Sequence, residues 1–316
     1  MTEASARPRS ARTVFLGSGA FAVPTLGALV AHPRVELVGV VTAPPRPAGR
    51  SGVHTATPVA AAAPSGVPLL TPERLRAPES LAEIGALRPE LAVLADYGQI
   101  VPAPLLELQH GALNLHPSLL PRHRGASPIP ATILAGDDET GVTLIRMDPG
   151  LDTGDIVAVE RITLAGDELA PDLEERLATI GAALLDRSIG PWLDGTLDAR
   201  PQPDAGATLT RPLRREDGRL DPRRSAVELD RQIRAYQPWP GSFVDTTAGR
   251  LVVWSATQGD VTGDAPPAGT FDANGLGVAG GERLTLREVQ PAGGRRMSWD
   301  AFLRGHPSII GTTIVE

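Results

Sequence analysis

The chain has 316 residues, of which 41% are hydrophobic, so it can form one large domain or two of ordinary size. It contains no cysteine, which excludes disulfide bonds and cysteine-based zinc sites, and its net charge of −7 argues against a protein that coats nucleic acid indiscriminately. All 30 basic residues are arginine, so phosphate contacts must come from arginine, histidine or the backbone. The N-terminus has no signal-peptide-like apolar run and no segment has the length of a membrane span, so we expect a cytoplasmic protein.

The first 200 residues alternate between short apolar runs and helical patterns. A glycine turn follows the run at residues 14–16, and Leu26, Leu29 and Val30 then recur at helical spacing before a second run at 35–42. Further strands are expected at 91–95, 112–115 and 142–147, helices around 81–87 and 129–134, and a long amphipathic helix at 169–193. This alternation predicts an α/β domain with a mostly parallel, doubly wound sheet.

The composition changes at residues 201–210, which are rich in Pro, Gly, Asp and Thr, as linkers are. After them, short strand-like runs such as "RLVVWSA" and "RLTLREVQPAGG" stand between turn signals, a pattern typical of a small β-barrel or sandwich. We therefore expect one domain over residues 1–200, a linker over 201–210 and a second domain over 211–316.

The glycine turn "VFLGSGAFAVP" begins like a dinucleotide-binding fingerprint, with Gly17 and Gly19 after a strand. However, Val23 and Pro24 stand where a third small residue is needed. The second strand ends in "VVTAPPRP", with no acidic residue to bind a ribose hydroxyl. The turn is therefore better explained as a tight strand-to-helix connection, and an NAD-dependent enzyme is the weaker alternative.

Asn114 and His116 lie two residues apart at the end of the run "ALNLH", so on a strand they face the same side. Open α/β sheets bind ligands at the carboxyl ends of their strands. Asp152 follows in the glycine-rich segment "MDPGLDTGDI", where its carboxylate could approach an imidazole. An amide, an imidazole and a carboxylate suit acyl transfer to a substrate amine, because they can stabilise an oxyanion, transfer a proton and orient the imidazole.

Other interpretations of these residues stay open. A histidine at a strand end is more often a hydrogen-bonded or surface residue than a catalyst, and an aspartate in a glycine-rich turn usually caps it. Ser118 is a candidate nucleophile, but no G-x-S-x-G elbow surrounds it. His110, His116 and His123 with an aspartate fit no metal-binding spacing, so no metal is expected.

Several separated motifs, in one order over nearly the whole chain, resemble the folate-dependent formyltransferases. They are "VTAPPRPAGR", "ELAVLADYGQIVP", "NLHPSLLPRHRGASPI", "GVTLIRMDPGLDTGDI", "EDGRLD" and "IRAYQPWPGSF". The resemblance implies a Rossmann-like formyltransferase domain followed by a small C-terminal β-barrel related to OB folds. It also implies 10-formyltetrahydrofolate as the formyl donor, without a nicotinamide cofactor.

The resemblance carries roles onto matching positions. Asn114 would polarise the formyl carbonyl and hold the oxyanion, His116 would transfer the proton, and Asp152 would keep this histidine protonated or oriented. The residues expected to line the folate site are Ser118, Leu119, Leu120 and Pro121, together with Tyr97, Gly98 and Ile100.

The implied acceptor is the α-amino group of methionine on initiator tRNA, whose phosphates require a positive surface. The candidate residues for tRNA binding are Arg46, Arg50, Arg122, Arg124, Arg214 and Arg215. The chain departs from the family after "RPAGR", where "SGVHTATPV" replaces the usual run rich in Gly and Lys, so tRNA binding by this loop is in doubt. Taken alone, the acidic residues around Arg214 and Arg215 would favour a solvated, salt-bridged surface, and the resemblance reverses this preference.

The catalytic residues do not choose between two acceptors, because sugar-nucleotide N-formyltransferases resemble this chain in the same elements. The "MDPGLDTGDI" form, the "RPAGR" loop and the match through the C-terminal domain favour tRNA. A non-catalytic folate- or RNA-binding relative is a third alternative, and the intact Asn114, His116 and Asp152 set argues against it. By resemblance alone we expect a monomer.

Overall fold

The computed structural model describes residues 9–48, 53–259 and 264–315, and the chain divides into two compact units. The first unit comprises residues 1–128, 139–163 and 174–210, and the second comprises residues 129–138, 164–173 and 211–316. Within the described ranges, no helix is long and apolar enough to cross a membrane.

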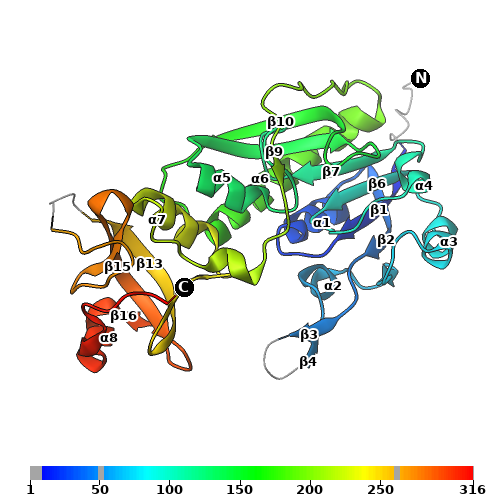
Figure 1. Cartoon of the computed structure of the whole chain (residues 1–316). Coiled ribbons are helices and arrows are strands. Elements are labelled where there is room, and N and C mark those ends of the chain that lie inside the picture. The colour runs from blue at the N-terminus through cyan, green and yellow to red at the C-terminus, as the bar shows by residue number, and fades with distance from the viewer. Residues whose placement is uncertain (1–8, 49–52, 260–263, 316) are drawn as a thin grey trace, which may run out of the picture. The chain divides into compact units, whose positions relative to one another are not determined.

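The first unit is built on a seven-stranded sheet with the strand order β10-β9-β7-β6-β1-β2-β5 (Figure 1). Its strands are β1 (Ala11–Gly17), β2 (Val35–Val41), β5 (Leu69–Leu70), β6 (Leu91–Ala95), β7 (Ala112–His116), β9 (Glu139–Arg146) and β10 (Asp155–Thr163). The pairs from β7 through β5 are parallel, whereas β9 runs antiparallel to both β7 and β10. The expectation of a mostly parallel sheet is therefore confirmed.

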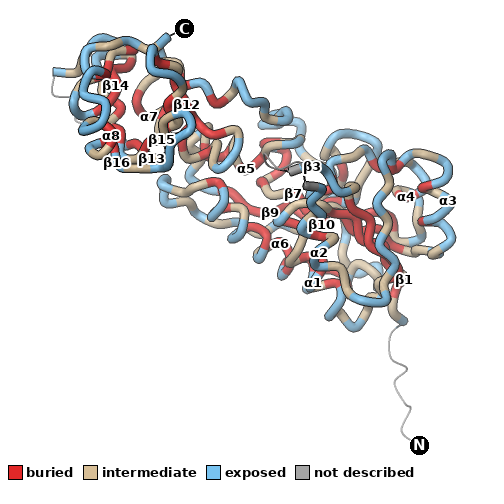
Figure 2. The backbone as a smooth tube through the Cα atoms, turned by 90° about the horizontal axis from the view of Figure 1, so that it is seen from below, coloured by how far each residue is buried: buried red, intermediate tan, exposed pale blue. Residues whose placement is uncertain are grey.

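Helices cover both faces of this sheet. On one face, Val14, Leu94 and Ala112 form a core cluster with residues of α3 (Pro78–Ala86) and α4 (Ala103–Leu106). The other face packs against α6 (Ala170–Leu193), where Gly181 approaches side chains of β7 and β9 and of the segment that precedes α1 (Ala22–Ala31). Figure 2 shows that the buried backbone is concentrated in the strands, as a parallel sheet covered on two sides requires.

Smaller elements complete the first unit. A hairpin of β3 (Arg46–Ala48) and β4 (Val53–Thr55) projects away from the sheet beyond α2 (Pro58–Ala62) (Figure 1). The short strands β8 (Arg124–Gly125) and β11 (Leu209–Thr210) pair in parallel, although the latter lies in the segment with linker-like composition.

The second unit contains an antiparallel sheet of five strands, which confirms the expected β-rich C-terminal region. The strands are β12 (Ser242–Thr246), β13 (Gly249–Gln258), β14 (Gly275–Val278), β15 (Glu282–Pro291) and β16 (Met297–Ser298), and the helices are α5 (Pro128–Ala135, all but its first residue), α7 (Ala226–Ala235) and α8 (Trp299–Gly305). Ser225 and Glu228 form a capping box that starts α7. Leu229 and Ile233 of this helix belong to the core cluster under the sheet.

Candidate active site

The strand β7 delivers Asn114 and His116 to the carboxyl end of the parallel sheet. Asn114 is half-buried, whereas His116 is only 4% exposed. The Nε2–H of His116 donates to the carbonyl oxygen of His123 at 2.9 Å, because a carbonyl can only accept. The imidazole is thus fixed in a buried position with its Nδ1 atom left to face another group.

That group is Asp152, which lies on the loop between β9 and β10. Asp148 organises the loop, since its carboxylate accepts from the Gly150 backbone N–H and from the Thr153 hydroxyl. Asp152 itself has a φ of +53°, in the left-handed region that non-glycine residues rarely adopt. The loop therefore holds Asp152 in a strained backbone conformation.

The Asp152 carboxylate connects three parts of the site. Its Oδ2 atom lies 3.7 Å from His116 Nδ1 and accepts the backbone N–H of Gly125 at 2.8 Å. Its Oδ1 atom lies 3.4 Å from Asn114 Nδ2. The structure thus brings together the three residues that the sequence singles out, within one unit and at one edge of the sheet.

The turn after β7 is packed tightly against β9. The Thr143 hydroxyl donates to the Ser118 carbonyl at 2.7 Å and accepts the Leu120 backbone N–H at 3.2 Å. The Ser118 side chain is fully buried and donates to the Arg122 carbonyl. Among the expected folate residues of this turn, Leu119 is half-buried and Pro121 is buried.

The segment of residues 200–210, hereafter the strap, crosses the site. Arg200 pairs through its backbone with Ile156 of β10, and the Thr208 carbonyl accepts the Arg124 backbone N–H at 2.9 Å. Gln202 and Thr208 contact the loops that carry Asp152 and His123. We did not predict these two residues, because their contacts join positions 48 to 85 residues apart and no local pattern signals them.

Three of the residues expected to line the folate site follow directly after β6. Tyr97 is buried, its hydroxyl has no hydrogen-bond partner within the described ranges, and burial raises the pKa of Tyr97 to about 12. Gly98 has a φ of +79° and Ile100 is 75% exposed.

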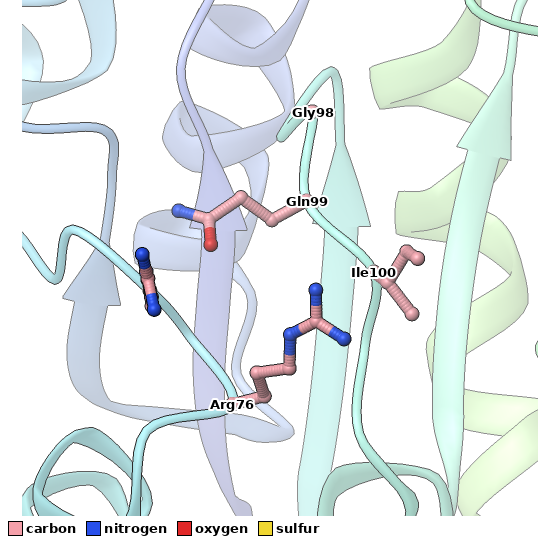
Figure 3. Close-up of a pocket in the computed structure, with 5 residues that line it drawn as sticks. Arg76, Gly98, Gln99 and Ile100 are labelled. Carbon is pink, nitrogen blue, oxygen red and sulfur yellow. The ribbon is translucent and has the colours of Figure 1, made fainter.

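A pocket of about 570 Å³ borders this segment and is lined by Arg74, Arg76, Gly98, Gln99 and Ile100 (Figure 3). The Arg76 side chain extends toward the turn at Gly98 (Figure 3). Gln99 anchors the turn, since its Oε1 accepts the Leu75 backbone N–H at 2.9 Å. The two guanidinium groups make the pocket suited to an anionic group.

The glycine turn after β1 packs against the end of β6. The Asp96 carbonyl accepts the backbone N–H groups of Ser18 and Gly19, and a Cβ on Gly19 would overlap the Asp96 carboxylate. A side chain at position 19 would therefore require the Asp96 carboxylate to move. Nearby, burial and the Asp96 charge raise the pKa of Glu174, whose carboxylate accepts the Phe21 backbone N–H.

The expected tRNA-binding arginines differ in what holds them. Arg46 is exposed on the projecting hairpin, and Arg122 is exposed in the turn after β7. Arg124 is half-buried and its guanidinium donates to Gln202. Arg50 lies outside the described residues.

Arg214 and Arg215 are exposed next to or within the short 3-10 helix η1 (Arg215–Gly218). Arg214 lies 3.8 Å from Glu216, the longest of the contacts that the arginines of this segment make with carboxylates. Its neighbour Arg211, by contrast, is held by Asp217 at 2.5 Å. This segment thus combines salt-bridged arginines with others that extend into solvent.

Known proteins resemble this chain over most of its length. The formyl transferase family matches residues 11–189, and the formyl transferase C-terminal domain matches residues 212–307. The chain is 44% identical over 299 residues to a methionyl-tRNA formyltransferase of Roseiflexus sp., which covers 93% of this chain and 92% of the relative. It is 43% identical over 307 residues to that of Myxococcus xanthus, which covers 95% and 97%.

Solved structures share the fold at lower identity. A methionyl-tRNA formyltransferase from Clostridium thermocellum superposes with a TM-score of 0.52 at 16% identity, over 78% of this chain and 93% of that one. An N-formyltransferase from Helicobacter canadensis, solved with folinic acid and dTDP-3-aminofucose, gives a TM-score of 0.62 at 17% identity, over 88% and 98%. These likenesses show the fold of the chain and leave its acceptor to other observations.

Proposed function

The chain belongs to the formyl transferase family, and we propose that it transfers the formyl group of 10-formyltetrahydrofolate to the α-amino group of methionyl initiator tRNA. The observation that supports this most directly is the meeting of Asn114, His116 and Asp152 at one edge of the sheet. The relatives named methionyl-tRNA formyltransferase align over more than nine-tenths of the chain, which favours tRNA over a sugar nucleotide.

In the first step of the proposed reaction, the methionyl amine attacks the formyl carbon. A new C–N bond forms, and the formyl oxygen becomes the oxyanion of a tetrahedral intermediate. Asn114 Nδ2 carries two N–H groups, of which one points toward Asp152 Oδ1 at 3.4 Å. The second donates to the developing oxyanion, where a positioned donor stabilises the transition state.

In the second step, the bond between the formyl carbon and N10 of the folate breaks. The proton lost by the attacking amine ends on the departing N10, and His116 transfers it. His116 donates to the His123 carbonyl through Nε2 and turns Nδ1 toward Asp152, which orients the ring. The substrate competes with the His123 carbonyl for the Nε2 proton.

We place the folate between two segments of the first unit. The ring system lies against Tyr97 and the turn from Ser118 to Pro121, including Leu119 and Leu120, and the segment through Gly98 to Ile100 leads from it to the pocket. The glutamate carboxylates at the other end of the molecule lie in the pocket, against Arg74 and Arg76. The basis is charge: these guanidinium groups border the expected folate segment and can bind carboxylates with paired hydrogen bonds.

We assign tRNA contacts to exposed arginines on both units. On the first unit these are Arg46 and Arg122, with Arg50 as a further candidate, and on the second unit they are Arg214 and Arg215. Arg124 contributes through its position, because its guanidinium already binds Gln202.

The proposed function is tested by offering two acceptors in parallel. Purified protein is incubated with 10-formyltetrahydrofolate and either methionyl initiator tRNA or a panel of amino-sugar nucleotides. Formylation of the tRNA alone supports the proposal. Formylation of a sugar nucleotide alone would keep the catalytic residues and reject the tRNA acceptor, and transfer to neither would reject the proposed activity.

A further inference from the structure

The strap contacts both loops that hold the His116–Asp152 pair. We infer that it sets the geometry of this pair, with Gln202 and Thr208 as positioning residues that act through Asp152 and His116. The inference rests on the proposed catalytic roles of these two residues.

Gln202 uses every hydrogen-bonding group of its side chain. Its Nε2 atom donates to the carbonyl oxygens of Asp152 at 2.8 Å and Gly154 at 2.7 Å. Its Oε1 atom accepts from Arg124 Nε at 3.0 Å and Nη2 at 2.7 Å. An amide has two N–H donors and two acceptor sites, so the side chain is fully satisfied in this position. It therefore ties the Asp152 loop to the segment after β7.

The hydrogen bonds of Gln202 hold the backbone of Asp152 in its unusual conformation. Asp152 has a φ of +53°, a conformation that persists only where its surroundings impose it. Gln202 holds the carbonyl of this residue, and the Gly125 N–H holds its carboxylate at 2.8 Å. The main chain and the side chain of Asp152 are thus fixed from two directions. Releasing the carbonyl frees the backbone to relax and moves the carboxylate relative to His116.

Thr208 acts on the other member of the pair. Its hydroxyl accepts the His123 backbone N–H at 2.8 Å, and its carbonyl accepts the Arg124 N–H at 2.9 Å. The His123 carbonyl in turn accepts the Nε2 proton of His116 at 2.9 Å. Thr208 therefore fixes the backbone segment whose carbonyl sets the orientation of the imidazole.

The strap also lies too close to β8 for a larger residue there. Gly125 has a φ of +102°, and a Cβ at this position would overlap the Thr210 carbonyl. Glycine is therefore required where the strap runs alongside, and the N–H of the same residue donates to the Asp152 carboxylate. The pairing of β8 with β11 places Gln202, Thr208 and Gly125 in one connected arrangement around Asp152.

The first test is Gln202→Glu, which keeps the size of the side chain and its pairing with Arg124. It replaces the two donors to the loop by a carboxylate oxygen that repels both carbonyls. We expect kcat for formyl transfer to fall by roughly 10²-fold, as for a displacement of about 1 Å in a catalytic group, with KM for both substrates unchanged. The control is Asp204→Ala, an exposed strap residue, which should keep the wild-type kcat. A wild-type kcat in Gln202→Glu would overturn the inference.

The second test uses the exposed Thr208, where substitution leaves the core intact. Thr208→Val removes the hydroxyl at constant shape, whereas Thr208→Ser keeps it. We expect kcat to fall roughly 10-fold in the valine variant, the effect of one neutral hydrogen bond, and to stay near wild type in the serine variant. Equal rates in both variants would contradict the role given to the hydroxyl.

A double-mutant cycle separates the inference from the proposed function. If Gln202 acts through Asp152, adding Gln202→Glu to Asp152→Asn should lower kcat little further, because the two changes remove one function. Independent, multiplying losses would overturn the inference. Wild-type turnover of Asp152→Asn alone would instead reject the catalytic role of Asp152, and with it the proposed site.

Discussion

The amide nitrogen of Asn114 lies 3.4 Å from Oδ1 of Asp152, although the two residues are separated by 38 positions in the chain. The other oxygen of the same carboxylate faces His116. One carboxylate thus orients both the proposed oxyanion donor and the proposed proton-transfer group. Because its two oxygens are used separately, a change at Asp152 should affect both steps of the reaction.

We expect Asp152→Asn and His116→Ala to lower kcat by about 10²- to 10⁴-fold, the usual contribution of general acid–base catalysis. The asparagine variant keeps an acceptor for the Gly125 N–H, so it should fold normally. Single-turnover formyl transfer and thermal melting measure the two properties. Asp167→Asn, an exposed carboxylate before α6, is the control. Near wild-type turnover in either site variant would reject its assigned role.

Much of the fold could be predicted from the sequence because burial leaves a local pattern. The β6 strand falls at the expected residues 91–95, and α6 spans nearly the whole amphipathic segment. The strand β10 was not expected, because at the sheet edge only Val157 of its nine residues is buried, three are exposed, and its apolar run is interrupted. Local apolar patterns therefore signal the buried strands better than the edge strands.

The residues of the candidate site likewise fall into those that a local sequence pattern indicates and those that it does not. Asn114 and His116 could be paired from strand periodicity, and Asp152 could be added because its loop is rich in glycine. Gln202 and Thr208 could not be found this way, since their composition is that of a linker and their partners lie far away in sequence. Hydrogen bonds between distant loops depend on the assembled fold, and the sequence carries no spacing that reports them.

The arginine pocket predicts how the donor is recognised. We expect Arg76→Ala to raise KM for 10-formyltetrahydrofolate roughly 5- to 10-fold, through loss of a charge-assisted contact at a solvent-exposed site, with kcat little changed. A donor without the glutamate, 10-formyltetrahydropteroate, should show the same KM with both proteins. An equal rise in KM for the two donors would show that Arg76 does not bind the carboxylates.

Because the pKa of Glu174 is raised, we predict that this residue makes a pH-dependent contribution to stability. Burial and the Asp96 charge raise its pKa above that of an unfolded glutamate, so the folded state binds the proton more tightly. The contribution of Glu174 to the free energy of unfolding should therefore decrease as the pH rises through its raised pKa, above about pH 4. Glu174→Gln keeps an acceptor for the Phe21 N–H and removes the charge, so its free energy of unfolding should exceed that of wild type at pH 7 and converge with it near pH 4.

Urea denaturation at several pH values measures this difference. The control is Glu175→Gln, an exposed neighbour on the same helix, which should show the pH profile of the wild type. A stability difference between Glu174→Gln and wild type that is independent of pH would show that the substitution acts through packing and not through the buried charge.

We predict that the β3–β4 hairpin of the first unit contacts the tRNA. Arg46 is exposed at the start of β3, and the basic run usual for this loop is replaced by "SGVHTATPV". We expect Arg46→Ala to raise KM for the tRNA most strongly at low salt, because the loss of a phosphate contact also makes binding less sensitive to salt, with KM for the folate unchanged. A tRNA KM equal to that of wild type at every salt concentration would remove the hairpin from the interface.

We predict a second contact with tRNA at Arg214 and Arg215, because no short salt bridge among the residues that the structure describes neutralises the charge of these two side chains. Arg214 lies 3.8 Å from Glu216, whereas Arg223 is paired with Asp221 at 2.8 Å. Each phosphate contact contributes about 0.7 to 0.9 to the slope of log K against log salt, so alanine at both positions should lower the slope by about twice that amount. Arg223→Ala removes an equally exposed charge from the same segment and serves as the control. If the control lowers the slope as much as the double variant, then tRNA responds to the net charge of the segment and not to these two side chains.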